Sequence, residues 1–177
     1  FPYIERAMRG EQNLLWPSEV KWFAKSSGTT NARSKFIPVT TEALEECHFK
    51  GGKDLLSIYV NNNPETRIFS GKGLGVGGSS QVNEFDPTST SYYGDVSAVI
   101  IQNLPPWAEF IRTPSLEVAL MNNWEEKIER LARETIGVNV THIAGVPTWT
   151  ILLLQHILAL EKKSSVMEVW PNLEVFF

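Results

Sequence analysis

A hydroxyl-rich stretch near the N-terminus holds the residue types best suited to chemistry. Residues 26–30 read Ser-Ser-Gly-Thr-Thr, and Lys35 follows five positions after Thr30. Hydroxyl groups, peptide N–H groups and an ammonium are donors that bind a polyphosphate, and a glycine lets the backbone approach it closely. The same residue types also favour an ordinary turn. Composition alone therefore leaves a phosphate loop and a polar hairpin turn both open.

Two predicted strands position this stretch. Val20, Trp22 and Ala24 stand at alternate positions, which predicts a strand over residues 20–25. Residues 35–40 predict a second strand, and Pro38 indicates that it lies at a sheet edge, because proline has no N–H for a neighbouring strand. The hydroxyl-rich stretch is therefore expected to join two strands.

The rest of the chain alternates between helical and extended patterns. Helices are expected over residues 1–9, 41–60, 96–104, 115–121, 124–136 and 148–162, and strands over 67–70, 80–85, 138–144 and 173–177. Gly73, Gly75 and Gly78 match G-x-G-x-x-G, but no helix follows them, so a glycine-rich hairpin turn over 71–78 is predicted. Residues 86–93 are expected to form a loop, and Glu125–Lys127 a solvated helix face. Strands and helices that alternate predict an α/β sheet.

Composition limits the classes of partner and compartment. The chain has 177 residues and a net charge of −4, so no basic field favours nucleic acid or an anionic membrane. Its one cysteine, Cys47, allows no internal disulfide, which fits a cytoplasmic protein. The longest apolar run is too short to span a bilayer. The three histidines lack metal-ligand spacing, so no metal site is expected.

The order of residues in the hydroxyl-rich stretch resembles the phosphate loop of the acyl-adenylate-forming superfamily. Its distance to Lys35 is more specifically similar to the acyl acid amido synthetases, the auxin-responsive promoter family, which includes bacterial homologues. Residues 94–98, 140–149 and 170–173 resemble further segments of that family in the same order. Many members carry glycine where this chain has Ala32, a departure that bears on phosphate contact by the Ala32 backbone.

The resemblance implies a fold and a boundary. Residues 1–177 would form a single α/β fragment of the large N-terminal adenylation domain, a mixed sheet with flanking helices and a β-hairpin region. The family's later Tyr-x-x-Ser-Glu segment, its ribose-binding Asp and its small C-terminal domain are expected to lie outside this sequence. The truncated domain is therefore expected to be inactive alone.

The resemblance also implies an activity and its residues. The family uses ATP and Mg²⁺ to adenylate a small carboxylic acid, and then transfers the acyl group to an amino acid. The residues that would hold the phosphates are Ser26, Ser27, Gly28, Thr29, Thr30 and Lys35, with Lys35 as the catalytic cation. Val146, Pro147 and Trp149 would line the pocket of the acid, although plain helix packing explains them equally well. The acid, the amine and the oligomeric state stay open.

Two alternatives share much of this pattern. An acyl-CoA ligase of the same superfamily would keep the loop and use a thiol acceptor. A non-catalytic ligand-binding or interaction module would keep the fold without the chemistry.

Overall fold

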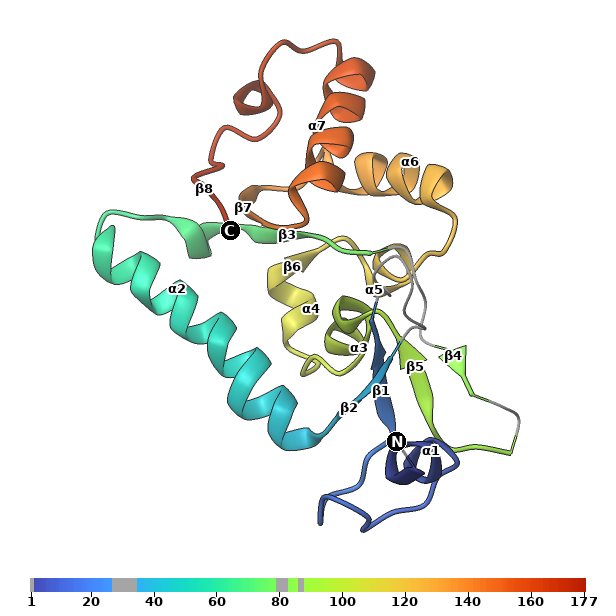
Figure 1. Ribbon diagram of the computed structural model, residues 1–177. Coiled ribbons are helices and arrows are strands. Elements are labelled where there is room, and N and C mark those ends of the chain that lie inside the picture. The colour runs from blue at the N-terminus through green and yellow to red at the C-terminus, as the bar shows by residue number, and fades with distance from the viewer. Residues whose placement is uncertain (1, 27–34, 79–82, 86–87) are drawn as a thin grey trace. The chain divides into compact units, whose positions relative to one another are not determined.

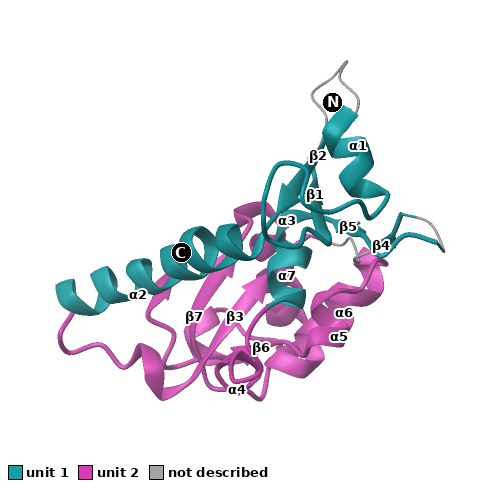
Figure 2. Cartoon of the chain, turned by 90° about the horizontal axis from the view of Figure 1, so that it is seen from below, with its two compact units in different colours: residues 1–62, 80–103 teal, residues 63–79, 104–177 magenta. Residues whose placement is uncertain are grey.

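The computed structural model describes residues 2–26, 35–78, 83–85 and 88–177 (Figure 1). The chain divides into two compact units. Residues 1–62 and 80–103 form unit 1, and residues 63–79 and 104–177 form unit 2 (Figure 2). Each unit is built around its own sheet.

Unit 1 contains a mixed four-stranded sheet in the order β2-β1-β5-β4. Its strands are β1 (Trp22–Lys25), β2 (Phe36–Val39), β4 (Asn83–Glu84) and β5 (Tyr92–Gly94). β1 pairs antiparallel with β2 and parallel with β5. The predicted hairpin around the hydroxyl-rich stretch is therefore confirmed, and Pro38 lies on an edge strand as expected. The strand β5 was missed, because residues 86–93 predicted only a loop.

The helices of unit 1 are α1 (Pro2–Met8), the π-helix η1 (Ala43–Phe49), α2 (Lys50–Asn62) and α3 (Val96–Gln102). Gly51 and Gly52 lie in α2, where an added Cβ would meet no atom within 4 Å. The helix therefore continues through both glycines in spite of their low helix propensity. Phe23 is completely buried, and its ring centroid lies 5.5 Å from that of Phe85. The Phe85 ring in turn packs on Phe36 of β2 and Tyr93 of β5, at centroid distances of 5.1 and 4.8 Å.

Unit 2 contains a parallel four-stranded sheet in the order β6-β3-β7-β8. Its strands are β3 (Lys72–Val76), β6 (Arg112–Thr113), β7 (Val140–Gly145) and β8 (Val175–Phe176). Its helices are η2 (Ile68–Ser70), α4 (Ala108–Ile111), α5 (Leu116–Ala119), α6 (Trp124–Thr135), α7 (Pro147–Glu161) and η3 (Val166–Glu168). Together the two units give the mixed α/β fold that the sequence predicted.

The glycine-rich segment is the main correction, because residues 72–76 form the inner strand β3 and not a hairpin turn. Leu74 and Val76 are each 1% exposed and face the core. Gly73 lies on the other face, where an added Cβ would clash with the ring of His142. The glycines therefore make room on the second face of the sheet, and the strand predicted over 67–70 is instead the 3-10 helix η2.

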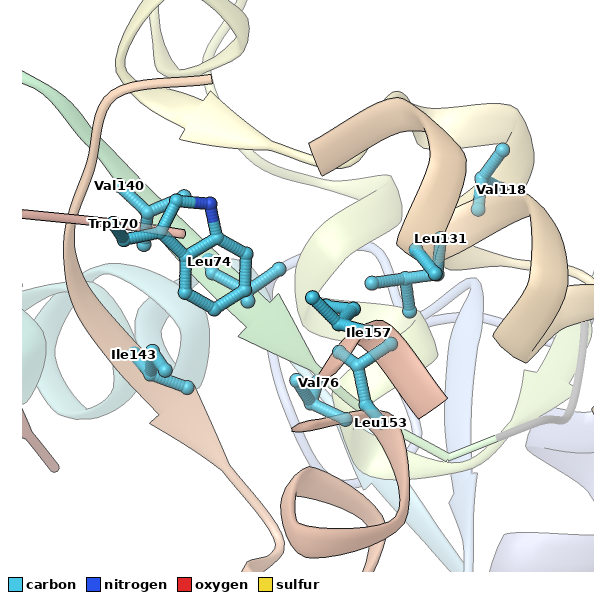
Figure 3. Close-up of a cluster of buried hydrophobic side chains, with 10 residues drawn as sticks. Leu74, Val76, Val118, Leu131, Val140, Ile143, Leu153, Ile157 and Trp170 are labelled. Atoms are coloured by element: carbon cyan, nitrogen blue, oxygen red, sulfur yellow. The ribbon is translucent and has the colours of Figure 1, made fainter. Parts of the chain in front are cut away.

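The core of unit 2 lies between this sheet and the helices α6 and α7 (Figure 3). Leu74, Val76, Val140 and Ile143 come from the sheet, and Leu131, Leu153 and Ile157 from the two helices. Trp170 closes the cluster at 1% exposure, and its indole Nε1 donates to the carbonyl of Thr135 over 3.0 Å. The sheet and α7 are therefore packed against each other through this one cluster.

Candidate functional site

Ser26 and Lys35 are the two described residues on either side of the hydroxyl-rich loop. The backbone N–H of Ser26 donates to the carbonyl of Lys35 over 2.9 Å, and the Lys35 N–H donates to the Ser26 hydroxyl over 3.0 Å. The two ends of the loop are thus held together at the mouth of the hairpin. Ser27, Gly28, Thr29 and Thr30 lie outside the described residues, so their phosphate contacts stay a prediction.

Cationic side chains gather at the loop end of this sheet. Because β1 and β5 are parallel, with Ala24 opposite Gly94, Asp95 follows β5 at the same end as Lys25. The ammonium of Lys25 lies 5.8 Å from the centroid of the Tyr93 ring, a cation–π contact. Lys35 is exposed beside the loop. This end of the sheet therefore carries two lysines, one on each side of the loop, together with the carboxylate of Asp95.

In unit 2, the carboxyl ends of the parallel strands meet at one edge. Along the chain β6 follows β3 on one side, and β7 then lies on the other side of β3, so the strand order reverses between β3 and β7. Ligands of open α/β sheets bind outside the carboxyl ends of the strands at such a point. Here the N–H of Val146 donates to the carbonyl of Val76 over 3.3 Å, and α7 begins at Pro147.

The three residues expected at the acid pocket have different surroundings at this edge. Val146 is 45% exposed and precedes α7 without a side-chain cap for it. Pro147 lines a groove in unit 2. Trp149 is half-buried and packs on Trp124 of α6, with ring centroids 4.0 Å apart. The structure thus brings Pro147 to a cavity and Trp149 to a helix contact, and their role toward an acid stays a prediction.

The groove has a volume of about 520 Å³ and runs along α7 and β8. Its lining is mostly aliphatic and comprises Ile143, Pro147, Thr150, Ile151, Leu154, Val166, Met167, Leu173, Glu174, Val175 and Phe176. The Thr150 hydroxyl donates to the carbonyl of Val146 over 3.1 Å. The carboxylate of Glu174 accepts from the Thr66 hydroxyl and from the Arg67 N–H. The groove therefore offers apolar surface for the body of a ligand beside the N-terminus of a 15-residue helix.

His142 lies on the sheet face opposite the groove, since its neighbour Ile143 lines that groove. Its Nδ1 is 3.2 Å from the Thr141 hydroxyl, and its ring meets the Phe177 ring edge-on at 6.0 Å. Burial lowers the pKa of His142, which favours the neutral ring at neutral pH. His142 therefore packs the second face of the sheet above Gly73.

Lys127 is the residue that the sequence-based interpretation placed wrongly. The charged run around it predicted a solvated helix face, but Lys127 is only 1% exposed. Its ammonium donates to the carbonyl of Gly78 over 2.5 Å and to that of Ala119 over 2.7 Å. The signal available in the sequence is its position one helical turn before the buried Leu131.

The described residues contain no group of three His, Cys, Asp or Glu side chains placed to hold a metal ion. Within the same residues, none of the helices has the length and apolar character needed to cross a membrane. The loop belongs to unit 1 and the groove to unit 2.

A comparison with models of known families identifies the family of this chain. A model described as the GH3 family N-terminal domain matches residues 1–177, the whole of this sequence. The chain belongs to the GH3 family. Among curated proteins, none matches this GH3 domain. The resemblance predicted from the loop and the later segments is therefore confirmed.

Solved structures share the fold of this GH3 domain. One is described as the AtGH3.15 acyl acid amido synthetase in complex with 2,4-DB, with a TM-score of 0.62 and 18% identity over 89% of this chain. Another, the GH3.15 acyl acid amido synthetase, has a TM-score of 0.65 and 15% identity over 99% of this chain. The domain spans 27% and 38% of those two chains.

Proposed function

We propose that this GH3 domain is the N-terminal part of an ATP-dependent acid–amino acid ligase. The enzyme adenylates a small carboxylic acid and transfers the acyl group to the amine of an amino acid. Membership of the GH3 family supports the reaction class, and solved structures of similar fold are described as acyl acid amido synthetases. The observation that carries the proposal is the hairpin mouth, where Ser26 and Lys35 hold the ends of a hydroxyl-rich loop together.

The loop of unit 1 binds the phosphates of ATP. Ser26, Ser27, Gly28, Thr29 and Thr30 supply hydroxyl and peptide donors, and Lys35 supplies positive charge. Positive charge there stabilises the negative charge that shifts onto pyrophosphate as the acid attacks the α-phosphate. Bound Mg²⁺ would add further charge neutralisation.

The carboxyl edge of unit 2 receives the acid. The first turn of α7 has no side-chain cap, and the N–H groups at a helix N-terminus favour a carboxylate. Val146, Pro147 and Trp149 lie at this turn, and the apolar groove begins at Pro147. An acid with an apolar body and one carboxylate therefore matches the two parts of this edge.

Acid-dependent ATP–pyrophosphate exchange by the full-length protein tests the proposal. Across a panel of carboxylic acids, at least one should stimulate exchange, and the product formed with amino acids or with coenzyme A identifies the acceptor. An acyl-CoA product would show a different ligase of the superfamily. No stimulation by any acid would favour a binding module.

The role of the loop is tested by Lys35→Ala in the same protein. Loss of a cation aimed at developing phosphate charge should lower exchange by about 100-fold. Lys163→Ala, an exposed lysine after α7, is the matched control and should leave exchange unchanged. Near-normal exchange by the Lys35 variant would show that the phosphates bind elsewhere.

A further inference from the structure

Lys127 is a buried cation held by the backbone. It lies on α6, whose start is fixed by Asn123, because the side chain of Asn123 accepts from the Glu126 N–H over 3.1 Å. Lysine is almost never fully buried unless its ammonium has partners, since desolvation of the charge is costly. Here the carbonyls of Gly78 and Ala119 accept at 2.5 and 2.7 Å, and the carbonyl of Gly77 lies 3.5 Å away.

These carbonyls belong to two segments that lie far apart in the sequence. Gly77 and Gly78 follow the last residue of β3, and Ala119 is the last residue of α5. A glycine pair has more backbone freedom than any other pair of residues. The hydrogen bonds from Lys127 of α6 to the two glycine carbonyls restrict that freedom. The ammonium of Lys127 therefore fixes the backbone direction of Gly77 and Gly78 after β3.

The exit of β3 lies at the same carboxyl edge as the first turn of α7, where the acid is proposed to bind. Val76 ends β3, and its carbonyl accepts from Val146, the residue before α7. Gly77 and Gly78 therefore stand beside the β7–α7 junction, at the point where the strand order reverses. A change in the path of this glycine pair alters the wall next to the first turn of α7.

We propose that Lys127 is a positioning residue for acid binding, and that its ammonium fixes the Gly77–Gly78 wall at the carboxyl edge of the second sheet. The inference rests on the proposed function. Lys127 touches no substrate, and it acts through the peptide groups that it holds. Its loss should weaken binding of the acid while leaving the ATP loop of unit 1 unaffected.

Stability alone cannot test this role, because replacing a buried charge by an apolar side chain of similar shape is neutral or stabilising in some proteins. The informative measurement is KM for the acid and KM for ATP, determined separately in acid-dependent ATP–pyrophosphate exchange. A merely structural role would reduce the amount of active enzyme, and so lower kcat without changing KM for the acid. A positioning role changes KM for the acid selectively.

The experiment compares Lys127→Met, Lys127→Arg and the control Lys163→Met in the full-length protein. For Lys127→Met we expect KM for the acid to rise about tenfold, with KM for ATP within about twofold of wild type. Lys127→Arg, which keeps the charge and its donors, should give a smaller rise, and the control should behave as wild type.

An unchanged KM for the acid in folded Lys127→Met, or equal rises in both KM values, would overturn the proposal. If Lys127→Met shows no cooperative thermal unfolding, Lys127→Arg decides in the same way. Wild-type protein is measured first. Absence of exchange in the wild type would overturn the proposed function and this inference together, whereas active wild type with an unchanged variant overturns the inference alone.

Discussion

Gly145 is the residue at which β7 comes too close to β3 for any side chain. An added Cβ would clash with the carbonyl oxygen of Val76 and lie 2.9 Å from the Val76 Cβ. The carbonyl cannot move freely, because it accepts from the Val146 N–H. The glycine therefore belongs to the geometry of the carboxyl edge and not to a flexible turn.

The variant Gly145→Ala should destabilise the protein by about 1–3 kcal/mol, the usual cost of forcing extra atoms into a packed site. Urea unfolding measures the change. Gly75→Ala on β3 is the matched control, since its added Cβ would have its nearest neighbour, the Thr113 carbonyl, at 4.0 Å. Equal stability of the two variants would contradict the close approach of the strands at Gly145.

Among the elements, α6 and α7 are joined by a charged contact at their surface. The ring Nε2 of His156 lies 2.6 Å from a carboxylate oxygen of Glu129, and Arg133 donates to the other oxygen over 2.5 Å. The hydrogen bond with His156, and then that with Arg133, lower the pKa of Glu129. Because the folded pKa lies below the unfolded one, the carboxylate stabilises the folded protein above the ordinary glutamate pKa of about 4.3.

That stabilisation is lost as the pH falls through the lowered pKa of Glu129. The variant Glu129→Gln should therefore reduce Tm at pH 7, and the difference from wild type should shrink toward about pH 3. Thermal unfolding over this range checks the trend. Glu65→Gln, at an exposed loop position with no ion pair among the described residues, serves as the control. A Glu129→Gln effect independent of pH would show that the contact contributes through packing only.

The sequence predicted some elements well because their signals are local. The hairpin around the hydroxyl-rich loop follows from alternating side chains on both sides of Ser26 and Lys35, and its edge position follows from Pro38. The helix after Gly145 follows from Pro147 at its first turn and a long apolar run. In each case one short segment carries the whole signal.

Other elements depend on contacts between distant segments, which the sequence does not show. In β3 only Leu74 and Val76 carry a strand pattern, and Gly73 before them reflects the His142 ring on the neighbouring strand. Lys127 reads as a surface charge until Gly78 and Ala119 supply its acceptors. The groove is only partly predictable for the same reason, since it joins Pro147 to β8 and η3.

At the scale of the whole molecule, the two units carry different parts of the proposed chemistry. Unit 1 contains the loop that we propose for the phosphates, and unit 2 contains the carboxyl edge and the groove that we propose for the acid. Neither unit includes the Tyr-x-x-Ser-Glu segment that the family resemblance assigns to the adenine and the metal. The domain spans 27% and 38% of two solved chains of similar fold.

Because these 177 residues lack the Tyr-x-x-Ser-Glu segment, we expect that the domain does not catalyse acid-dependent ATP–pyrophosphate exchange by itself, whereas the full-length protein does. Adenylation depends on holding the acid and the α-phosphate in a reactive geometry, and loss of that positioning removes up to about 7–11 kcal/mol of barrier reduction. Exchange by the isolated domain should therefore match the enzyme-free background. Cooperative thermal unfolding of the isolated domain is the control that it is folded. Exchange above background that depends on Lys35 would show instead that the loop and the groove suffice for the first half-reaction.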